Sequence, residues 1–199
     1  MRRTHALTVS TLALTLALGL AGCASNPADS DSSSTEPSTS PSQPADIEAT
    51  AATGSVVAGD GYSYTIPVGW GQQDASLAPG TDTVAADSAP TGPFASNINV
   101  VLSPSGAFTA DDVEAAAGNE LETAGATDVE VLDRVGVAGS ETAHVTAVMT
   151  VGDLTYRIHQ YYVTSDDQTY VVTFSAASDL PDEQIIAIAE SVLATWTWA

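Results

Sequence analysis

Residues 142–163 read TAHVTAVMTV-GD-LTYRIHQYYV, and this stretch sets the architecture of the chain. Two runs with strand-like composition flank Gly152-Asp153, a dipeptide pattern typical of a two-residue hairpin turn. The pattern predicts two antiparallel strands in which Val151 faces Leu154. Both faces of this hairpin carry large apolar residues, whereas a sheet face open to water would be polar. We therefore expect the sheet to be covered on both sides.

Further strands are predicted on either side of the hairpin. Short apolar or alternating stretches indicate strands at 62–66, 83–86, 97–102, 129–137 and 168–176. The last of these follows the hairpin after a short turn and forms the third strand of an antiparallel meander. The segment from Gly71 to about Gly80 is rich in Gly, Gln, Asp and Pro, and we interpret it as a loop.

Two helices complete the pattern. Thr109 and Asp112 form an acidic variant of the capping box, and Gly125 is a natural C-terminal stop. Pro181, followed by acidic residues at 182–183, opens a last helix. The expected fold is α+β: an antiparallel sheet of about six strands flanked by helices on both faces, an α/β/α sandwich.

The N-terminal segment has the layout of an export signal. Arg2-Arg3 precede an apolar run at 6–20, which ends in LAGC at 20–23 and contains the single cysteine of the chain. A spanning helix needs about 20 apolar residues, and this run is shorter and interrupted by Thr and Ser. LAGC resembles the lipobox of bacterial lipoproteins. The resemblance implies cleavage between Gly22 and Cys23, lipidation of Cys23, and anchoring on the extracytoplasmic face of the cell membrane.

The chain is expected to divide into three parts. Residues 1–22 are the signal peptide, and 23–54 are the lipidated cysteine followed by a Ser/Pro/Thr-rich linker. That linker has too little apolar surface to offset the entropy of ordering and is predicted to be disordered. With about 30 residues it spans roughly 30 Å on average, which holds the domain off the membrane. Residues 55–199 are predicted to form one globular domain.

The charge balance is strongly acidic. Twenty-five acidic residues face four Lys and Arg, giving a formal net charge of −21. Such a chain repels phosphate backbones, which excludes a nucleic-acid partner. A cation-binding surface and simple solubility are both compatible with the acidity, and solubility is the favoured interpretation. A single cysteine allows no internal disulfide. We expect no cofactor and no bound metal, and we expect a monomer.

Three short motifs resemble a known family. IPVGW at 66–70, FASNINVV at 94–101 and VAG at 137–139 are similar to motifs of Mog1/PsbP-like domains. Among these, actinobacterial lipoproteins of the LpqN/LpqT type share the lipobox, the Ser/Pro linker and the single domain. The resemblance implies an antiparallel sheet between helices in a non-catalytic envelope protein that acts by binding. It transfers no catalytic residue.

Two histidines are the first candidate site. The hairpin register places His144 opposite Tyr161 and on the same face as His159 and Arg157, so these side chains form either a polar binding site or two metal ligands. Two histidines without a third ligand are weak evidence for zinc. The favoured interpretation is that they are sheet-face residues satisfied by Thr and Tyr hydroxyls.

Two tryptophans near the C-terminus are the second candidate site. Trp196 and Trp198 belong either to the core or to an exposed apolar interaction surface. Trp70 is assigned to the core. Asp166-Asp167 could contact Ca²⁺, but a tight turn ordinarily favours Asp, and the turn is the favoured interpretation.

Three functions remain open at this point. The leading hypothesis is a membrane-anchored, non-catalytic binding or accessory module that contacts another envelope protein or a lipid-like ligand. The alternative is an envelope hydrolase with an unfamiliar site near His144 and His159, although no nucleophile-elbow, P-loop or zinc-protease motif occurs. A structural spacer without a specific partner is the third hypothesis.

Overall fold

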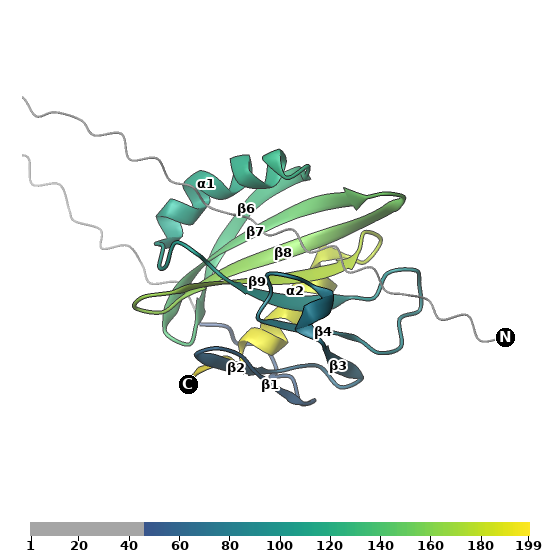
Figure 1. Ribbon diagram of the computed structural model, residues 1–199, viewed down its shortest axis with the longest axis horizontal. Coiled ribbons are helices and arrows are strands. Elements are labelled where there is room, and N and C mark those ends of the chain that lie inside the picture. Colours follow the sequence, from purple (N-terminus) through teal and green to yellow (C-terminus); the bar gives the residue numbers. More distant parts are fainter. Residues whose placement is uncertain (1–45) are drawn as a thin grey trace, which may run out of the picture.

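The structure is a computed structural model that describes residues 46–199 (Figure 1). Within these residues two β-sheets and two α-helices form the fold. In chain order the elements are β1 (Val56–Ala58), β2 (Tyr62–Thr65), β3 (Trp70–Gln73), the 3-10 turn η1 (Ala75–Leu77), β4 (Thr83–Asp87), β5 (Asn97–Leu102), α1 (Ala110–Thr123), β6 (Thr127–Val137), β7 (Ser140–Val151), β8 (Leu154–Thr164), β9 (Thr169–Ala177), α2 (Asp182–Leu193) and β10 (Thr197–Trp198).

The β7–β8 hairpin lies inside the large sheet and has the predicted register. Val151 pairs with Leu154, and His144 pairs with Tyr161. Gly152 has a positive φ of 62°, which a two-residue hairpin of the II′ kind requires at its first turn position. The hairpin prediction is therefore confirmed, and β9 pairs with β8 as the third strand of the meander.

The large sheet is antiparallel and has seven strands in the order β3-β4-β5-β9-β8-β7-β6, against about six expected. The extra strand is β3, which lies partly in the segment interpreted as a loop. Its sequence, WGQQ, has little strand propensity. It is a strand because its edge position pairs it with β4, from Trp70 opposite Asp87 to Gln73 opposite Val84.

The two helices cover opposite faces of this sheet, as expected for the sandwich. α1 packs on β6 and β7 through Val113, Ala117 and Leu121 (Figure 1). The capping box between Thr109 and Asp112 is present in both directions. α2 packs on β8 and β9 from the other side and buries Ile185, Ala189, Val192 and Leu193.

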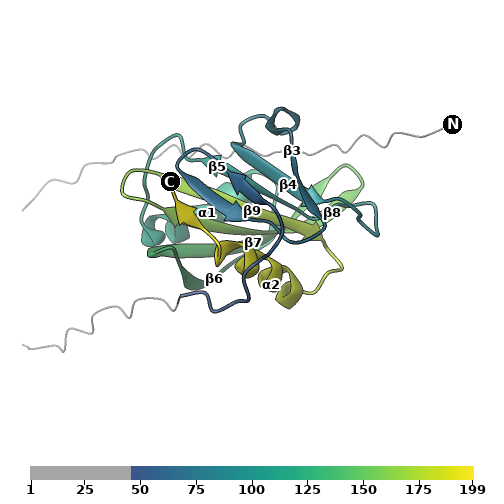
Figure 2. The same ribbon diagram turned by 90° about the horizontal axis from the view of Figure 1, so that it is seen from below.

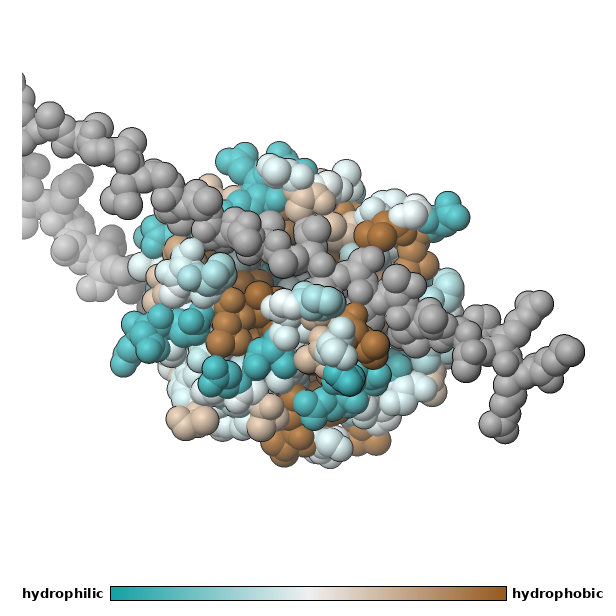
Figure 3. Space-filling model, viewed as in Figure 1, coloured by the Kyte–Doolittle hydropathy of each residue, from teal (hydrophilic) through white to brown (hydrophobic). Residues whose placement is uncertain are grey.

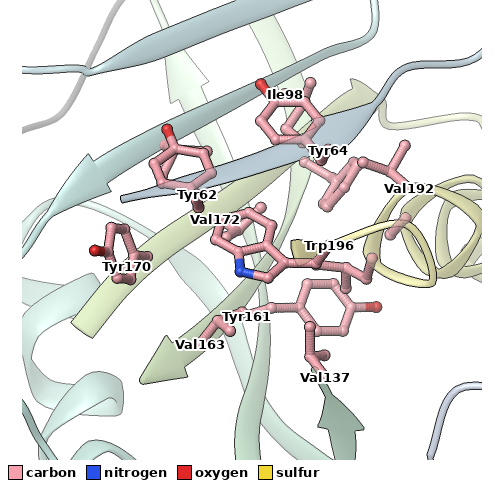
Figure 4. Packing of buried hydrophobic residues seen from close by; sticks show 14 of the residues in the cluster. Tyr62, Tyr64, Ile98, Val137, Tyr161, Val163, Tyr170, Val172, Val192 and Trp196 are labelled. Carbon is pink, nitrogen blue, oxygen red and sulfur yellow. The ribbon is translucent and has the colours of Figure 1, made fainter. Parts of the chain in front are cut away.

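A small sheet shares the α2 side of the molecule. It has the order β1-β2-β10, and the sequence patterns did not predict β1 or β10, which have three and two residues. Figure 2 shows these strands beside α2, against the same face of the large sheet. The main core lies between them, with Trp196 in its middle, flat against Tyr62 at a centroid distance of 4.4 Å (Figure 4).

The described chain begins before the predicted domain boundary at residue 55. The Ile47 N–H donates to the Gly136 carbonyl oxygen at 3.3 Å, and the Ala52 N–H donates to the Ser191 carbonyl oxygen at 2.8 Å. The predicted signal peptide, Gly22, Cys23 and most of the predicted linker lie outside the described residues. Between residues 46 and 199 the structure contains no helix with the length and hydrophobicity needed to span a membrane.

Candidate functional site

Five of the predicted site residues fall into two separate places. His144, His159, Arg157 and Tyr161 lie together on the α2 side of β7 and β8. Trp198 lies at one end of the large sheet, where it lines an open groove with Asp166, Asp167 and with other residues that the sequence did not single out. Trp196 joins neither place and belongs to the core, with 4% of its surface exposed.

The two histidine rings contact each other directly. His144 Nε2 lies 2.9 Å from His159 Nδ1, a hydrogen bond that needs a proton on one nitrogen and a free lone pair on the other. His144 also stacks on Tyr161 at a centroid distance of 4.0 Å. The exposed fractions are 4% for His144 and 0% for His159. We name these two residues the histidine pair.

Burial keeps the histidine pair neutral. It lowers the pKa of His144 to about 3, and the neighbouring His159 acts in the same direction. Burial also lowers the pKa of His159, although the carboxylate of Asp182 opposes this shift. Two neutral rings can share one N–H···N bond, whereas protonating either ring would place a charge in the core.

An ion pair closes this region from solvent. Arg157 Nε lies 2.9 Å from Oδ1 of Asp182, the first residue of α2. The N–H is not directed at that oxygen, so the contact is an ion pair rather than a hydrogen bond. His159 Nε2 lies 3.8 Å from the same oxygen and 3.4 Å from Thr146 Oγ1. A substrate would have to displace this end of α2 to reach the imidazoles.

The histidine pair also lacks the geometry of a metal site. In the described part of the chain no three His, Cys, Asp or Glu residues are grouped so that they could hold a metal ion. Thr146 Oγ1 donates to the Ile158 carbonyl oxygen at 3.0 Å, so this hydroxyl links β7 to β8. The arrangement supports a structural role for the histidine pair, with the partly buried ion pair above it.

The second place is a groove of about 790 Å³ at the end of the large sheet. The β6–β7 and β8–β9 turns, the β1–β2 turn and the end of β10 form its walls. Figure 3 shows hydrophilic surface at the left of the molecule, where Figure 1 places the β8–β9 turn. The groove is lined by Asp60, Gly61, Leu102, Ala138, Gly139, Ser140, Thr164, Ser165, Asp166, Asp167, Gln168, Tyr170, Trp198 and Ala199. We name it the end groove.

The aromatic wall of the end groove is held in a fixed orientation. The Trp198 Nε1–H donates to the Ala138 carbonyl oxygen at 3.1 Å. Its ring lies 5.5 Å from that of Tyr170 and 5.8 Å from that of Trp196, edge to face with the latter. Because Trp198 is only half-buried, part of the indole is available to a ligand while its orientation is set by the core.

The rim of the end groove is acidic. Asp60, Asp166 and Asp167 are exposed and line it. The two arginines of the described chain are engaged elsewhere: Arg134 binds Asp111, Glu114 and Glu141, and Arg157 binds Asp182. The chain contains no lysine. None of the described residues therefore places a fixed positive charge beside these carboxylates.

Hydrogen bonds position two of the turns that carry these acids. The Asp60 N–H donates to Asp82 Oδ2 at 3.0 Å, and the Tyr62 hydroxyl donates to the same oxygen at 2.8 Å. Gln168 Nε2 donates to the Ser103 and Thr169 carbonyl oxygens, both at 2.9 Å. From sequence, Asp166 and Asp167 could be assigned to a turn, but no pattern showed that Asp60 would lie at the same groove.

Comparison with known proteins identifies the fold. No family model matches the chain, and no curated protein matches it. Among solved structures it is similar to LpqN of Mycobacterium tuberculosis, described as involved in cell envelope biogenesis, with 17% identity over 73% of this chain and 85% of that one, and a TM-score of 0.52. It is also similar to cyanobacterial PsbP of Synechocystis sp. PCC 6803, with 19% identity over 74% of this chain and 94% of that one, and a TM-score of 0.50.

The fold is Mog1/PsbP-like. The Ran-binding protein Mog1p of Saccharomyces cerevisiae is matched at 16% identity over 69% of this chain and 89% of that one, with a TM-score of 0.47. A structure from Bacteroides thetaiotaomicron is matched over 69% of this chain but 45% of its own length, at 13% identity and a TM-score of 0.44. The structural likeness to LpqN and PsbP shows a common fold and does not by itself transfer a function.

Proposed function

We propose that this protein is a lipid-anchored envelope lipoprotein whose domain is a non-catalytic binding or accessory module, and that the end groove is its binding surface. The observation that carries the proposal is the half-buried Trp198 at the wall of an open groove. A hydrogen bond to the Ala138 carbonyl oxygen and packing against Trp196 hold its ring in place. A positioned aromatic side chain in a concave surface is the usual anchor of a protein interface.

Two further observations support the envelope location. The LAGC motif at 20–23 resembles a lipobox, and the structurally similar LpqN is described as involved in cell envelope biogenesis. The proposed anchor is the lipidated Cys23, and the proposed tether is the part of the linker that precedes Ile47, where the first backbone hydrogen bond to the domain occurs. A lipid-like ligand in place of an envelope protein is the other occupant that we consider for the domain.

The anchor is tested by replacing its attachment atom. In the native host, the wild type is expected to incorporate labelled palmitate and to fractionate with membranes, whereas Cys23→Ala abolishes labelling and releases the protein. An unlabelled wild type, or a Cys23→Ala variant that remains in the membrane fraction after a high-salt wash, contradicts the proposed anchor.

The binding role is tested by crosslinking in the native envelope. A photo-crosslinking amino acid is introduced at position 167, on the rim of the end groove, and as a control at position 153, in the β7–β8 turn at the opposite end of the sheet. We expect a discrete crosslinked protein from position 167 that position 153 does not give. Identical products from both positions, or none from position 167, would contradict a binding role for the end groove.

A further inference from the structure

We propose that the end groove binds a basic peptide segment of its partner, with a lysine or arginine side chain placed against the Trp198 indole between Asp60 and the Asp166-Asp167 turn. This inference rests on the proposed function and names the chemical class of the partner. It is argued from charge, from the aromatic wall and from the shape of the groove.

The first argument is charge complementarity. Asp60 comes from the β1–β2 turn and Asp166 and Asp167 from the β8–β9 turn, so segments far apart in sequence bring three carboxylates to one groove. Arg134 and Arg157 are already in ion pairs with other acids. Because these carboxylates lack a cationic neighbour among the described residues, a basic partner relieves their mutual repulsion as it binds.

The second argument is the aromatic wall. An indole is the best of the aromatic rings at attracting a lysine or arginine side chain through its face. Trp198 lines the same groove as the three acids, and its Nε1–H is occupied by the Ala138 carbonyl oxygen at 3.1 Å. What the ring offers a ligand is therefore its π surface rather than its N–H donor. A cation beside carboxylates and against an indole has favourable contacts on two sides.

The third argument is shape, which favours a peptide over an enclosed small cation. The lining contains two aromatic residues, Tyr170 and Trp198, and Tyr170 is buried. Only Trp198 therefore offers part of its ring to a ligand, and the described residues form no closed aromatic cage. The rest of the lining is mostly turn backbone and short polar side chains such as Ser140, Ser165 and Thr164. These groups suit the backbone and side chains of an extended segment, which adds contacts beyond its charged groups.

The test uses the full chain, purified from membranes in detergent at physiological ionic strength. A short lysine-rich peptide and the same peptide with every lysine acetylated are titrated and followed by calorimetry. We expect the lysine peptide to bind and the acetylated peptide not to bind. Trp198→Ala and the double variant Asp166→Asn/Asp167→Asn are each expected to weaken binding about tenfold.

A matched variant separates the groove from the overall charge. Asp153→Asn/Asp179→Asn also removes two negative charges, but from exposed turns at the opposite end of the sheet. We expect it to change the affinity less than about twofold, because distant exposed charges are screened at this ionic strength. If this variant weakens binding as much as the groove variants, the attraction is diffuse and the inference is wrong.

Two other outcomes also overturn the inference. One is equal binding of the lysine and acetylated peptides. The other is groove-dependent binding of neutral phosphatidylcholine vesicles without peptide binding, which would identify a membrane surface as the occupant. If position 167 still crosslinks an envelope protein in either case, the proposed binding role is retained and the basic character of its partner is rejected.

Discussion

At the scale of single residues, the environment of the histidine pair is unlike that of a catalytic histidine. His144 and His159 bond to each other at 2.9 Å in the core, and 4% and 0% of their respective surfaces are exposed. The unfolded chain takes up protons on both imidazoles below their ordinary pKa of 6.5, while burial keeps the folded rings neutral to lower pH. Below that pH the unfolded state therefore binds more protons, and stability falls with falling pH.

This gives a pH prediction with a definite sign. From pH 6.5 downward, each histidine that stays neutral in the fold should reduce the free energy of unfolding by about 1.4 kcal/mol per pH unit. For His144 the decrease continues to about pH 3, where its folded pKa lies. Urea unfolding of the wild type and of His144→Phe at pH 7.5 and 5.0 measures it, and the variant is expected to lose less stability between the two pH values.

The carboxylates that both proteins share cancel in this comparison. Equal losses in wild type and His144→Phe would contradict the prediction. An imidazole titration of the folded wild type by NMR gives an independent check, because the His144 ring should take up no proton between pH 7 and 5.

Trp196 and Trp198 show how two residues of one type differ in role. Trp196 lies flat against Tyr62 with 4% of its surface exposed, whereas Trp198 is half-buried at the end groove. Trp196→Ala should lower the free energy of unfolding by about 3–5 kcal/mol, because it opens a large cavity. Trp198→Ala should cost less than about 2 kcal/mol, since it loses one hydrogen bond and partial burial. Thermal denaturation of both variants measures the difference, and a larger cost at Trp198 would be inconsistent with this packing.

At the scale of elements, α1 shows that local signals are reliable where an element is long and capped. Thr109 and Asp112 form the capping box, and the helix ends at Thr123, shortly before Gly125.

The short strands could not be predicted from local signals in this way. β1, β3 and β10 have three, four and two residues. All three are edge strands of their sheets, and β10 pairs with β2, which lies far away in the sequence. Such strands depend on the sheet that receives them, so local patterns do not reveal them.

Gly118 within α1 and Gly125 just after its end give a prediction in which the same substitution, glycine to alanine, has opposite effects on stability. Gly118 lies within the helix, and a Cβ there would meet no atom within 4 Å. Gly118→Ala should therefore raise the free energy of unfolding by about 0.5–1 kcal/mol. Gly125 has a φ of 91°, a conformation that disfavours any side chain, so Gly125→Ala should lower it by about 1 kcal/mol. Urea midpoints of the two variants test this, and shifts in the same direction would show that φ is not the deciding factor.

At the scale of the whole molecule, acidity limits stability. The chain has a formal net charge of −21, and its described arginines form the two ion-pair clusters around Arg134 and Arg157. Self-repulsion of this size destabilises the compact state. Because salt screens repulsion between exposed charges, the melting temperature should rise between low ionic strength and about 0.5 M NaCl.

Scanning calorimetry in NaCl and in KCl distinguishes screening from specific ion binding, since screening gives equal shifts for both salts. A melting temperature that falls with added salt would mean that the ion pairs at Arg134 and Arg157 outweigh the repulsion.

The amino-acid sequence by itself determined the antiparallel meander, the hairpin register and both helices, because periodicity, turn residues and caps act over a few neighbouring positions. It placed His144 beside Tyr161 for the same reason: pairing across a two-residue turn follows from counting outward from Gly152. The lipobox-like motif at 20–23 is likewise a local signal, and anchoring at Cys23 remains a prediction.

Tertiary structure alone decided the small sheet, the burial of Trp196 and the end groove. The groove joins Asp60, the Asp166-Asp167 turn and Trp198, which come from distant parts of the chain. No local pattern encodes such a meeting, because it depends on how β2, β9 and β10 pack around a shared core. The physical reason is range: propensities and caps are set by adjacent residues, whereas a groove exists only where remote segments come together.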